Sequence, residues 1–243
     1  MSHPYLLLWL EGPLQSWGHD SRFGRRDSLP FPTKSGVMGI ICAALGAAGP
    51  QEPLLARFAE LDMQVLGFSR QEKNGTVALR EPLLCDFHMV GSGYDDKDPW
   101  QRLLIPKTSD GKKAVGGGTK ITYRYYLQDS AFAVLLAVPA DLLTTIVEAL
   151  QNPVWDLALG RKNCVPTEFI FQGQFSNLPD AEQAAEKMAS EKQRVRDLKV
   201  VSGAVDGGEV LMLNDIPVAF GEQKRYRDRQ VTLFSEKLAS GSE

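Results

Sequence analysis

The sequence of 243 residues predicts an α+β protein with a ferredoxin-like or RRM-like palm. Apolar runs and helical patterns follow one another as strand, helix, strand, strand, strand, helix, strand. One basic, glycine-rich segment has little to bury, and removing it leaves the βαββαβ plan of such a palm. We expect the palm at residues 1–84 and 124–176, a projecting β-hairpin thumb at 85–123 and a small C-terminal α/β extension at 177–243.

The palm is expected to begin with a buried strand and a capped helix. Tyr5–Leu10 is a continuous apolar run, which is typical of a central strand. Gly12–Pro32 is irregular, and a loop of this length inside a compact domain is usually functional. Thr33 can cap the helix that follows, whose apolar residues recur at helical spacing. A second stripe consists of small residues and lets a neighbour approach closely: Gly36, Gly39, Ala43 and Gly46.

The remaining elements follow from apolar patterns and turn signals. Two strands, Asp62–Arg70 and Val77–Val90, are expected on either side of the hairpin signal Lys73–Gly75. Ala131–Val138 is a further strand, and a helix follows at Ala140–Gln151. Later elements are expected as a strand at Thr167–Phe175, a helix at Asp180–Leu198, short strands within Val201–Phe220 and one more strand at Gln230–Phe234.

Composition and motifs argue against several classes of protein. Cys42, Cys85 and Cys164 are widely separated and form no C-x-x-C pair, which suits a reducing cytoplasm and gives no zinc motif. Residues 1–10 lack the basic segment and cleavage site of a signal peptide, and the weakly polar run 36–49 is too short to span a bilayer. No Walker motif or G-x-G-x-x-G opens a helix. We therefore expect a cytoplasmic protein that uses no membrane, metal or cofactor.

Positive charge is concentrated in the expected thumb, although the whole chain has a formal charge of −3. Lys97–Arg124 holds seven basic and two acidic residues, whereas Asn177–Glu222 holds nine acidic and five basic ones. A basic arm with aromatic residues can neutralise phosphates and stack bases. Lysines also keep an exposed hairpin soluble and its edges unpaired, and charge alone does not decide between the two interpretations. The aromatic residues at the base of the arm are Trp100, Tyr123, Tyr125 and Tyr126.

Two further basic clusters lie outside the thumb. The first consists of Arg22, Arg25 and Arg26 in the long loop. These residues precede a helix whose first turn holds Lys34, Ser35 and Gly36, and a helix N-terminus offers free N–H groups to an anion. Capping without any ligand is the alternative explanation of the same pattern. The second cluster, Arg161 and Lys162, lies in a polar turn between a helix and a strand.

Taken together, four segments resemble the CasD family, the RAMP-type subunits of the type I-E CRISPR Cascade complex. The segments are GPLQSWG at residues 12–18, FPTKSGVMG at 31–39, TYRYYLQDSAF at 122–132 and LGRKNC at 159–164. Their order and spacing agree with the family over residues 5–175, and the similarity is weak beyond that point.

The resemblance implies an RNA-binding role in antiviral defence. Members of the family have a ferredoxin-like palm with a projecting thumb, bind the 5′ handle of the CRISPR RNA and cap the backbone subunits. They also touch the large subunit of the complex and meet target DNA only through the complex. The RNA-binding residues implied for this chain are Gln15, Trp17, Arg22, Arg25, Arg26, Lys34, Ser35, Gly36, Arg124, Arg161 and Lys162.

Two alternatives remain open: an enzyme and a pure protein scaffold. Some relatives from other CRISPR subtypes cleave precursor RNA without metal, which requires a base near a ribose 2′-OH and a group that protonates the leaving oxygen. His19 and His88 are the candidates, but spacing places no partner beside either of them. Since the motifs resemble a subtype in which a different subunit processes the RNA, we expect a non-catalytic subunit. The alternative is a metal-independent endoribonuclease that processes CRISPR precursor RNA.

Overall fold

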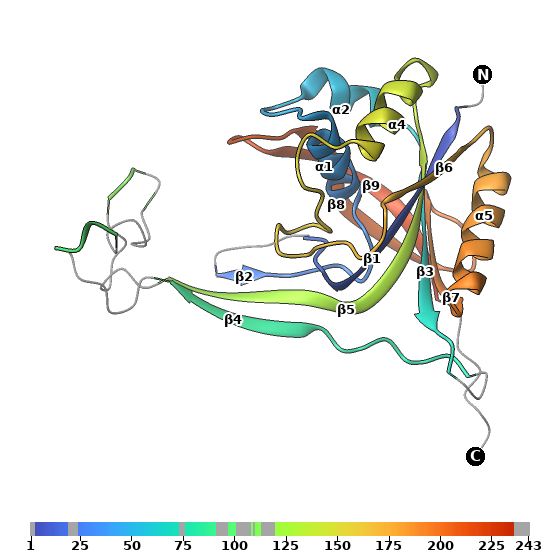
Figure 1. The fold of residues 1–243 in the computed structure, drawn as a ribbon, viewed down its shortest axis with the longest axis horizontal. Helices are drawn as coiled ribbons and strands as arrows, with labels where there is room; N and C mark the ends of the chain where they lie inside the picture. The colour runs from blue at the N-terminus through green and yellow to red at the C-terminus, as the bar shows by residue number, and fades with distance from the viewer. Residues whose placement is uncertain are drawn as a thin grey trace.

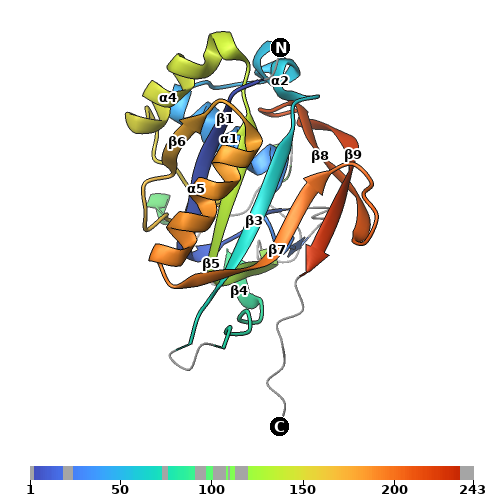
Figure 2. The ribbon, with the colours of Figure 1, turned by 90° about the vertical axis from the view of Figure 1, so that its right-hand side faces the viewer.

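The computed structural model describes residues 3–18, 24–72, 76–90, 97–100, 108, 110–112 and 120–235. These residues form a mixed α/β protein with a large, mainly antiparallel sheet and helices on both of its faces (Figures 1 and 2). Within these ranges, every helix is too short or too polar to cross a membrane.

The main sheet has the strand order β6-β1-β5-β3-β7-β9-β8, and each neighbouring pair in this order is antiparallel. Within this sheet β1 pairs with β5 from Tyr5 opposite Ala137 to Gln15 opposite Leu127. Two strands lie off this path, since β2 and β4 pair only with β5. The strands are β1 (Tyr5–Gln15), β2 (Arg25–Arg26), β3 (Met63–Arg70), β4 (Leu84–Val90), β5 (Lys120–Ala137), β6 (Phe171–Phe175), β7 (Arg194–Ser202), β8 (Glu209–Ala219) and β9 (Arg225–Ser235).

Helices cover the sheet unequally on its two faces. The described helices are α1 (Lys34–Leu45), α2 (Glu52–Phe58), α4 (Leu143–Gln151, after a 3₁₀ turn at Ala140–Leu142) and α5 (Leu178–Glu191). In Figures 1 and 2, α1, α2 and α4 lie on one face and α5 lies on the other. Successive side chains of a strand point to opposite faces. Leu6 and Leu8 of β1 therefore join the core under α1, while Leu7 and Trp9 pack under α5.

Several predicted elements are confirmed. The Thr33 side chain accepts a hydrogen bond from the Gly36 N–H at 3.1 Å and caps α1, as the sequence predicts. Gly46 ends α1 in the left-handed region, with φ of 65°. The buried first strand, the strand that ends at Arg70 and the helix that ends at Gln151 also lie where their patterns place them.

Other predicted boundaries are wrong, because long-range pairing decides them. The loop expected from Gly12 begins later, since β1 continues to Gln15 against β5 and Arg25–Arg26 form β2. The strand expected at Val77–Val90 begins only at Leu84, where it pairs with β5. The start of the predicted hairpin is present, since Gln71 and Val77 form an antiparallel bridge and the Ala78 N–H donates to the Arg70 oxygen at 2.9 Å. The turn signal between the two predicted strands, Lys73–Gly75, lies outside the described residues.

The C-terminal elements also differ from expectation. The helix predicted at Asp180–Leu198 ends at Glu191, and β7 begins at Arg194 because Leu198 and Val200 complete the sheet core. Helix α2 was not predicted from the sequence, since it has only seven residues. Of the strand predicted at Thr167–Phe175, only Phe171–Phe175 forms a strand, β6. In place of the short strands expected later, the chain forms the long strands β8 and β9. Since β7 pairs directly with β3, the C-terminal segment continues the main sheet, and the expected domain boundary at residue 176 stays a prediction.

A ribbon of strands leaves the body of the molecule (Figure 1). It consists of β4 and the first part of β5, with β2 on the other edge of β5. Leu84 of β4 lies opposite Tyr126 and Val90 opposite Lys120, so the ribbon coincides with the two arms expected for the thumb. Of the basic residues counted there, Arg102, Lys107 and Lys113 lie outside the described residues.

Candidate nucleic-acid interface

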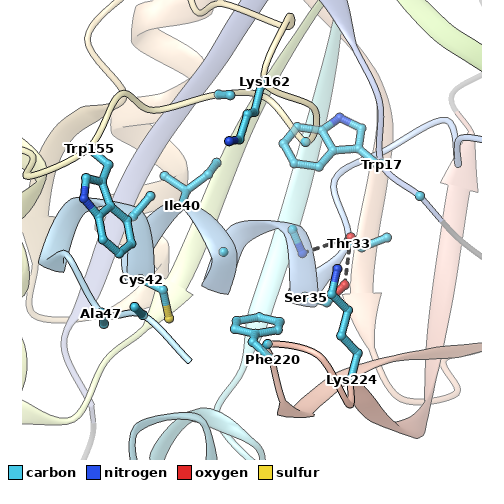
Figure 3. A pocket seen from close by; sticks show the side chains of 18 of the residues that line it. Trp17, Thr33, Ser35, Ile40, Cys42, Ala47, Trp155, Lys162, Phe220 and Lys224 are labelled. Carbon is cyan, nitrogen blue, oxygen red and sulfur yellow. Dashed lines mark hydrogen bonds between the residues drawn. The ribbon is translucent and has the colours of Figure 1, made fainter. Parts of the chain in front are cut away.

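A groove of about 840 Å³ runs over α1 and contains parts of three of the sequence motifs (Figure 3). The turn between β8 and β9 forms the wall that faces these motifs. The segment that follows α4 lines one end. The motif residues in its lining are Ser16, Trp17 and Gly18, then Thr33, Ser35, Gly36 and Gly39, and then Gly160 and Lys162. The residues from elsewhere include Trp155 and Asp156 after α4, and Phe220, Gly221, Lys224 and Tyr226 around the β8–β9 turn.

The small residues of α1 form the floor of this groove, and two of them, Gly36 and Gly39, differ in their surroundings. A Cβ atom on Gly36 would lie 2.8 Å from the ring of Trp17, so this glycine lets the indole pack directly on the helix. A Cβ atom on Gly39 would meet nothing within 4 Å, so Gly39 opens space. The stripe of small residues predicted from the sequence thus faces both a close neighbour and a cavity.

Gln15 and Trp17 shape the groove from below its surface. Both side chains are fully buried. The Trp17 indole N–H donates to the Gln15 carbonyl oxygen at 3.1 Å, and the Gln15 amide donates to the backbone oxygens of Leu10 at 3.0 Å and Ser130 at 2.7 Å. Because these polar groups are satisfied inside the protein, the two residues position the wall, and their polar atoms have no free surface to offer a ligand.

The turn at residues 159–164 packs on the motif at 12–18 without space between the two backbones. The Ser16 N–H donates to the Leu159 oxygen at 3.0 Å. Gly160 has φ of 94°, and a Cβ atom there would lie 1.8 Å from the Ser16 oxygen. Only glycine fits this position, which carries the neighbouring Lys162 to the rim of the groove.

The start of α1, predicted as an anion site, already holds a carboxylate of the protein. The backbone N–H of Lys34 donates to the Asp215 carboxylate of β8 at 2.7 Å, and Arg229 forms two bonds to the same carboxylate at 2.6 and 2.9 Å. The Lys34 ammonium donates to the backbone oxygens of Ala59 at 3.0 Å and Leu61 at 2.6 Å, where α2 ends. Lys34 is 2% exposed, so its charge is used inside the fold.

Burial lowers the pKa of Lys34 to about 8, and the nearby Arg229 adds to this effect. Between pH 8 and 10.5 the unfolded chain therefore binds more protons at Lys34 than the folded chain, so the free energy of unfolding rises with pH there. The gain approaches about 3 kcal/mol over the interval. A neutral amine retains two N–H donors for its two carbonyl partners, so deprotonation leaves these bonds possible.

We therefore expect wild type to gain more stability than Lys34→Met as the pH rises from 8 to 10.5. Urea denaturation of both proteins at several pH values measures the difference, and the variant corrects for the other groups that titrate in this range. Parallel curves for the two proteins would contradict the inference.

The predicted arginines gather at the base of the ribbon instead of in the groove. Arg161 donates to the backbone oxygens of Tyr125 at 3.3 Å and Arg26 at 2.9 Å, and its guanidinium lies 4.6 Å from the centre of the Tyr126 ring. It therefore ties the turn at 159–164 to β2 and β5. Arg26 lies opposite Arg124 in the parallel pairing of β2 with β5.

Arg25 and Arg124 keep more of their surface free. Arg25 is exposed, forms an ion pair with Asp27 at 2.8 Å and lies 4.8 Å from the centre of the Tyr125 ring. The hydrogen bond from Arg25 to Asp27 raises the pKa of Arg25. Arg124 is half-buried and donates to the Thr122 hydroxyl at 3.3 Å. The remaining predicted arginine, Arg22, lies outside the described residues.

The structure thus divides the predicted site into two neighbouring groups. Trp17, Ser35, Gly36 and Lys162 line the groove, whereas Arg25, Arg26, Arg124 and Arg161 lie at the ribbon base. The turn at 159–164 joins the groups, since it carries both Arg161 and Lys162.

Sequence reasoning missed several exposed side chains near both groups. On the ribbon, Phe87 is 54% exposed, and its ring centre lies 5.4 Å from that of Tyr123. In the groove, Trp155, Lys224 and Tyr226 line the walls. The last two lie in the segment KRYRDR at 224–229, a basic run with an aromatic residue that could have been noticed. It follows directly after the acidic region whose charge was counted as a whole.

Comparison with known proteins places the chain in a family. Residues 5–241 match the model of a CRISPR-associated protein family, Cas_Cas5. The chain belongs to the Cas5 family. The Cas5 chain is 30% identical over 172 residues to the CRISPR system Cascade subunit CasD of Escherichia coli (strain K12), which is 70% of each protein. The resemblance that the sequence motifs carry is therefore confirmed.

Two solved structures are similar to the whole Cas5 fold. One is a chain of a CRISPR RNA-guided surveillance complex, with a TM-score of 0.67 and 29% identity, covering 95% of this chain and 89% of the other. The second, described as a Cas protein, has a TM-score of 0.57 and 27% identity, covering 95% of this chain and 94% of the other. Because each alignment covers 95% of this chain, it extends past residue 175, where the resemblance found from the motifs ends, so the C-terminal strands also belong to the shared fold.

Proposed function

We propose that this Cas5 chain is an RNA-binding subunit of a type I-E CRISPR Cascade complex, where it binds the 5′ handle of the CRISPR RNA. The observation that carries the proposal is the convergence of three separate sequence motifs on one groove with a free lysine, Lys162, at its rim. As a cap of the complex, the chain would contact the backbone subunits and the large subunit, and meet target DNA only through the complex. The Cascade name of the E. coli relative and the surveillance complex that contains the structural relative support this assignment.

The groove has the chemistry that single-stranded RNA requires. Proteins bind unpaired RNA by stacking its bases on aromatic side chains and neutralising its phosphates. Trp155 is 46% exposed in the lining, and Lys162 is exposed with its amino end turned into the space over α1 (Figure 3). Within the described residues, Lys162 forms no ion pair that would compete with a phosphate. The hydroxyl of Ser35 adds a small donor at the start of α1.

The proposal includes a ferredoxin-like palm with a thumb. The order β6-β1-β5-β3 and the placement of α1 and α4 on one face support such a palm. The ribbon of β4 and β5 would be the thumb, and Arg25, Arg26 and Arg124 at its base would meet the RNA backbone as it leaves the groove. Exposed Phe87 and Tyr123 on the ribbon are suited to stacking.

We further propose that this role involves no RNA cleavage. Burial raises the pKa of the Cys42 thiol in the groove to about 11, so this thiol is protonated near neutral pH and does not supply the base that cleavage requires. Of the two histidine candidates, His88 lies on the ribbon, and His19 is outside the described residues. Incubation with a labelled CRISPR repeat hairpin in EDTA tests this part. Specific cleavage that His88→Ala abolishes would establish the endoribonuclease instead.

Charge reversal at Lys162 tests handle binding. We expect Lys162→Glu to weaken the binding of RNA that carries the repeat-derived 5′ handle by about tenfold or more, because a phosphate contact becomes a repulsion. Its side chain is exposed, so the melting temperature should stay that of wild type. Fluorescence anisotropy with the full chain gives the dissociation constants.

The matched control is Lys187→Glu, which reverses a charge on α5, on the opposite face of the sheet. It should leave RNA binding unchanged. Equal affinity of the wild type for RNAs with and without the handle would overturn the proposed function.

A further inference from the structure

We propose that the β8–β9 turn and the start of β9, together residues 220–226, form a second RNA-binding wall of the groove, on which Lys224 binds a phosphate and Tyr226 stacks a base of a single-stranded segment. This inference rests on the proposed function, since it takes the ligand to be RNA. It adds residues from the C-terminal part of the chain, where the sequence motifs give no guidance. The wall faces the lining residues of the motifs across α1 (Figure 3).

The turn is held in a defined position against the loop that follows α1. The Phe220 N–H donates to the Pro50 oxygen at 2.8 Å. Gly221 has φ of 79°, and a Cβ atom there would lie 3.5 Å from the backbone of Gly49. Arg225 forms an ion pair with Glu52 of α2 at 2.6 Å. The turn therefore presents its side chains to the groove from a fixed backbone, as a preformed binding wall requires.

The side chains on this wall match those on the wall opposite. Lys224 is exposed, and Figure 3 shows its amino end beside Ser35, while that of Lys162 enters from the other side. Tyr226 is 36% exposed, and Trp155 in the same lining is 46% exposed. The groove thus has an ammonium group on each side, an exposed aromatic ring on the proposed wall and a second exposed ring at the end lined by the segment after α4.

The charges of the lining favour a nucleic-acid strand as the occupant. Lys162 and Lys224 face the groove, and Asp156 is the carboxylate among the lining residues described. A polyanion with a regular phosphate spacing can satisfy both ammonium groups at once, and its bases supply the flat apolar surfaces that the aromatic rings need. An acidic peptide would satisfy the lysines but would leave the aromatic side chains unused.

The expected results separate the phosphate contact from the stacking contact. Lys224→Ala should weaken RNA binding several-fold and lower the slope of log Kd against log salt by about 0.7, the value for one contact to a single strand. Tyr226→Ala should weaken binding by about tenfold with the salt slope unchanged, because a lost stacking contact releases no counterion. Lys187→Ala on α5 removes the same charge as Lys224→Ala and should change neither quantity.

The experiment uses the purified full chain and two labelled RNAs of equal length, one with the repeat-derived handle and one scrambled, in anisotropy titrations from low to high salt. Melting temperatures verify folding, and a 4-thiouridine handle RNA should crosslink to the peptide that contains residues 220–226. If Lys162→Ala weakens binding while Lys224→Ala and Tyr226→Ala do not, the second wall is wrong and the proposed function stands. If the two RNAs bind alike but both wall variants weaken binding, the handle assignment fails and the wall is a general single-strand site. Unchanged RNA binding in both wall variants, as an acidic-peptide ligand predicts, overturns the inference.

Discussion

Replacing Asp215 with alanine should lower the free energy of unfolding by about 3–5 kcal/mol, the cost of leaving one member of a buried ion pair alone. The Asp215 side chain is 2% exposed and that of its partner, Arg229, is 9% exposed. The same carboxylate accepts the backbone N–H of Lys34 at the start of α1. The substitution therefore leaves a buried guanidinium and the N–H of Lys34 at the start of α1 without their partner. Urea denaturation followed by circular dichroism measures the loss.

The control is another acidic partner of a β9 arginine. Glu60 pairs with Arg227, but their side chains are 80% and 51% exposed. Exposed pairs contribute about 0–1 kcal/mol, so Glu60→Ala should be almost neutral. A loss for Asp215→Ala no larger than that for Glu60→Ala would show that the pair does not hold α1 to the C-terminal strands. RNA binding provides a second readout, because α1 is the floor of the groove.

Lys34 and Asp215 also show where prediction from the sequence stops. A capped helix with basic residues in its first turn predicts an anion at that end, and the anion is present. It is a carboxylate 181 residues further along the chain, and only the pairing of β8 with β9 brings it there. The local sequence predicted that an anion binds at the start of α1, whereas the order of the strands determines which residue supplies that anion. Lys34 therefore has a structural role inside the protein, although its motif placed it among the expected RNA-binding residues.

Local patterns succeeded where the contacts are close in sequence. Thr33 caps its helix through a residue three positions away, and apolar runs gave the central strands. They failed at Arg194–Leu198, whose helix-forming residues become part of β7. There Arg194 reaches Glu11 at 2.6 Å, across 183 residues. The motifs located one side of the groove, but Lys224 and Tyr226 reach it only because the β8–β9 turn folds back onto Pro50.

Replacing Gly160 with alanine should lower the free energy of unfolding by about 2–6 kcal/mol and should also weaken RNA binding. Its φ of 94° is strained for any residue with a side chain, which costs about 1–3 kcal/mol. The added Cβ would lie 1.8 Å from the backbone oxygen of Ser16, and the peptide unit that carries this oxygen is held by the hydrogen bond from the Trp17 N–H to the Ser28 hydroxyl at 2.9 Å. Relieving this overlap costs a further amount of about 1–3 kcal/mol. Denaturation curves and handle-RNA titrations of the same samples measure both effects.

Gly203 separates the two causes, because it has φ of 83° but open space around its missing Cβ. Gly203→Ala should cost only the backbone strain and leave RNA binding as in wild type, since Gly203 lies outside the groove lining. If the two variants lose equal stability, the overlap between residue 160 and Ser16 contributes no destabilisation beyond the backbone strain of the positive φ. If Gly160→Ala binds RNA as wild type does, RNA binding does not depend on the backbone packing that positions Lys162. A larger loss at Gly160 on both measures would mean that close backbone packing between two motifs places the lysine that the groove presents to RNA.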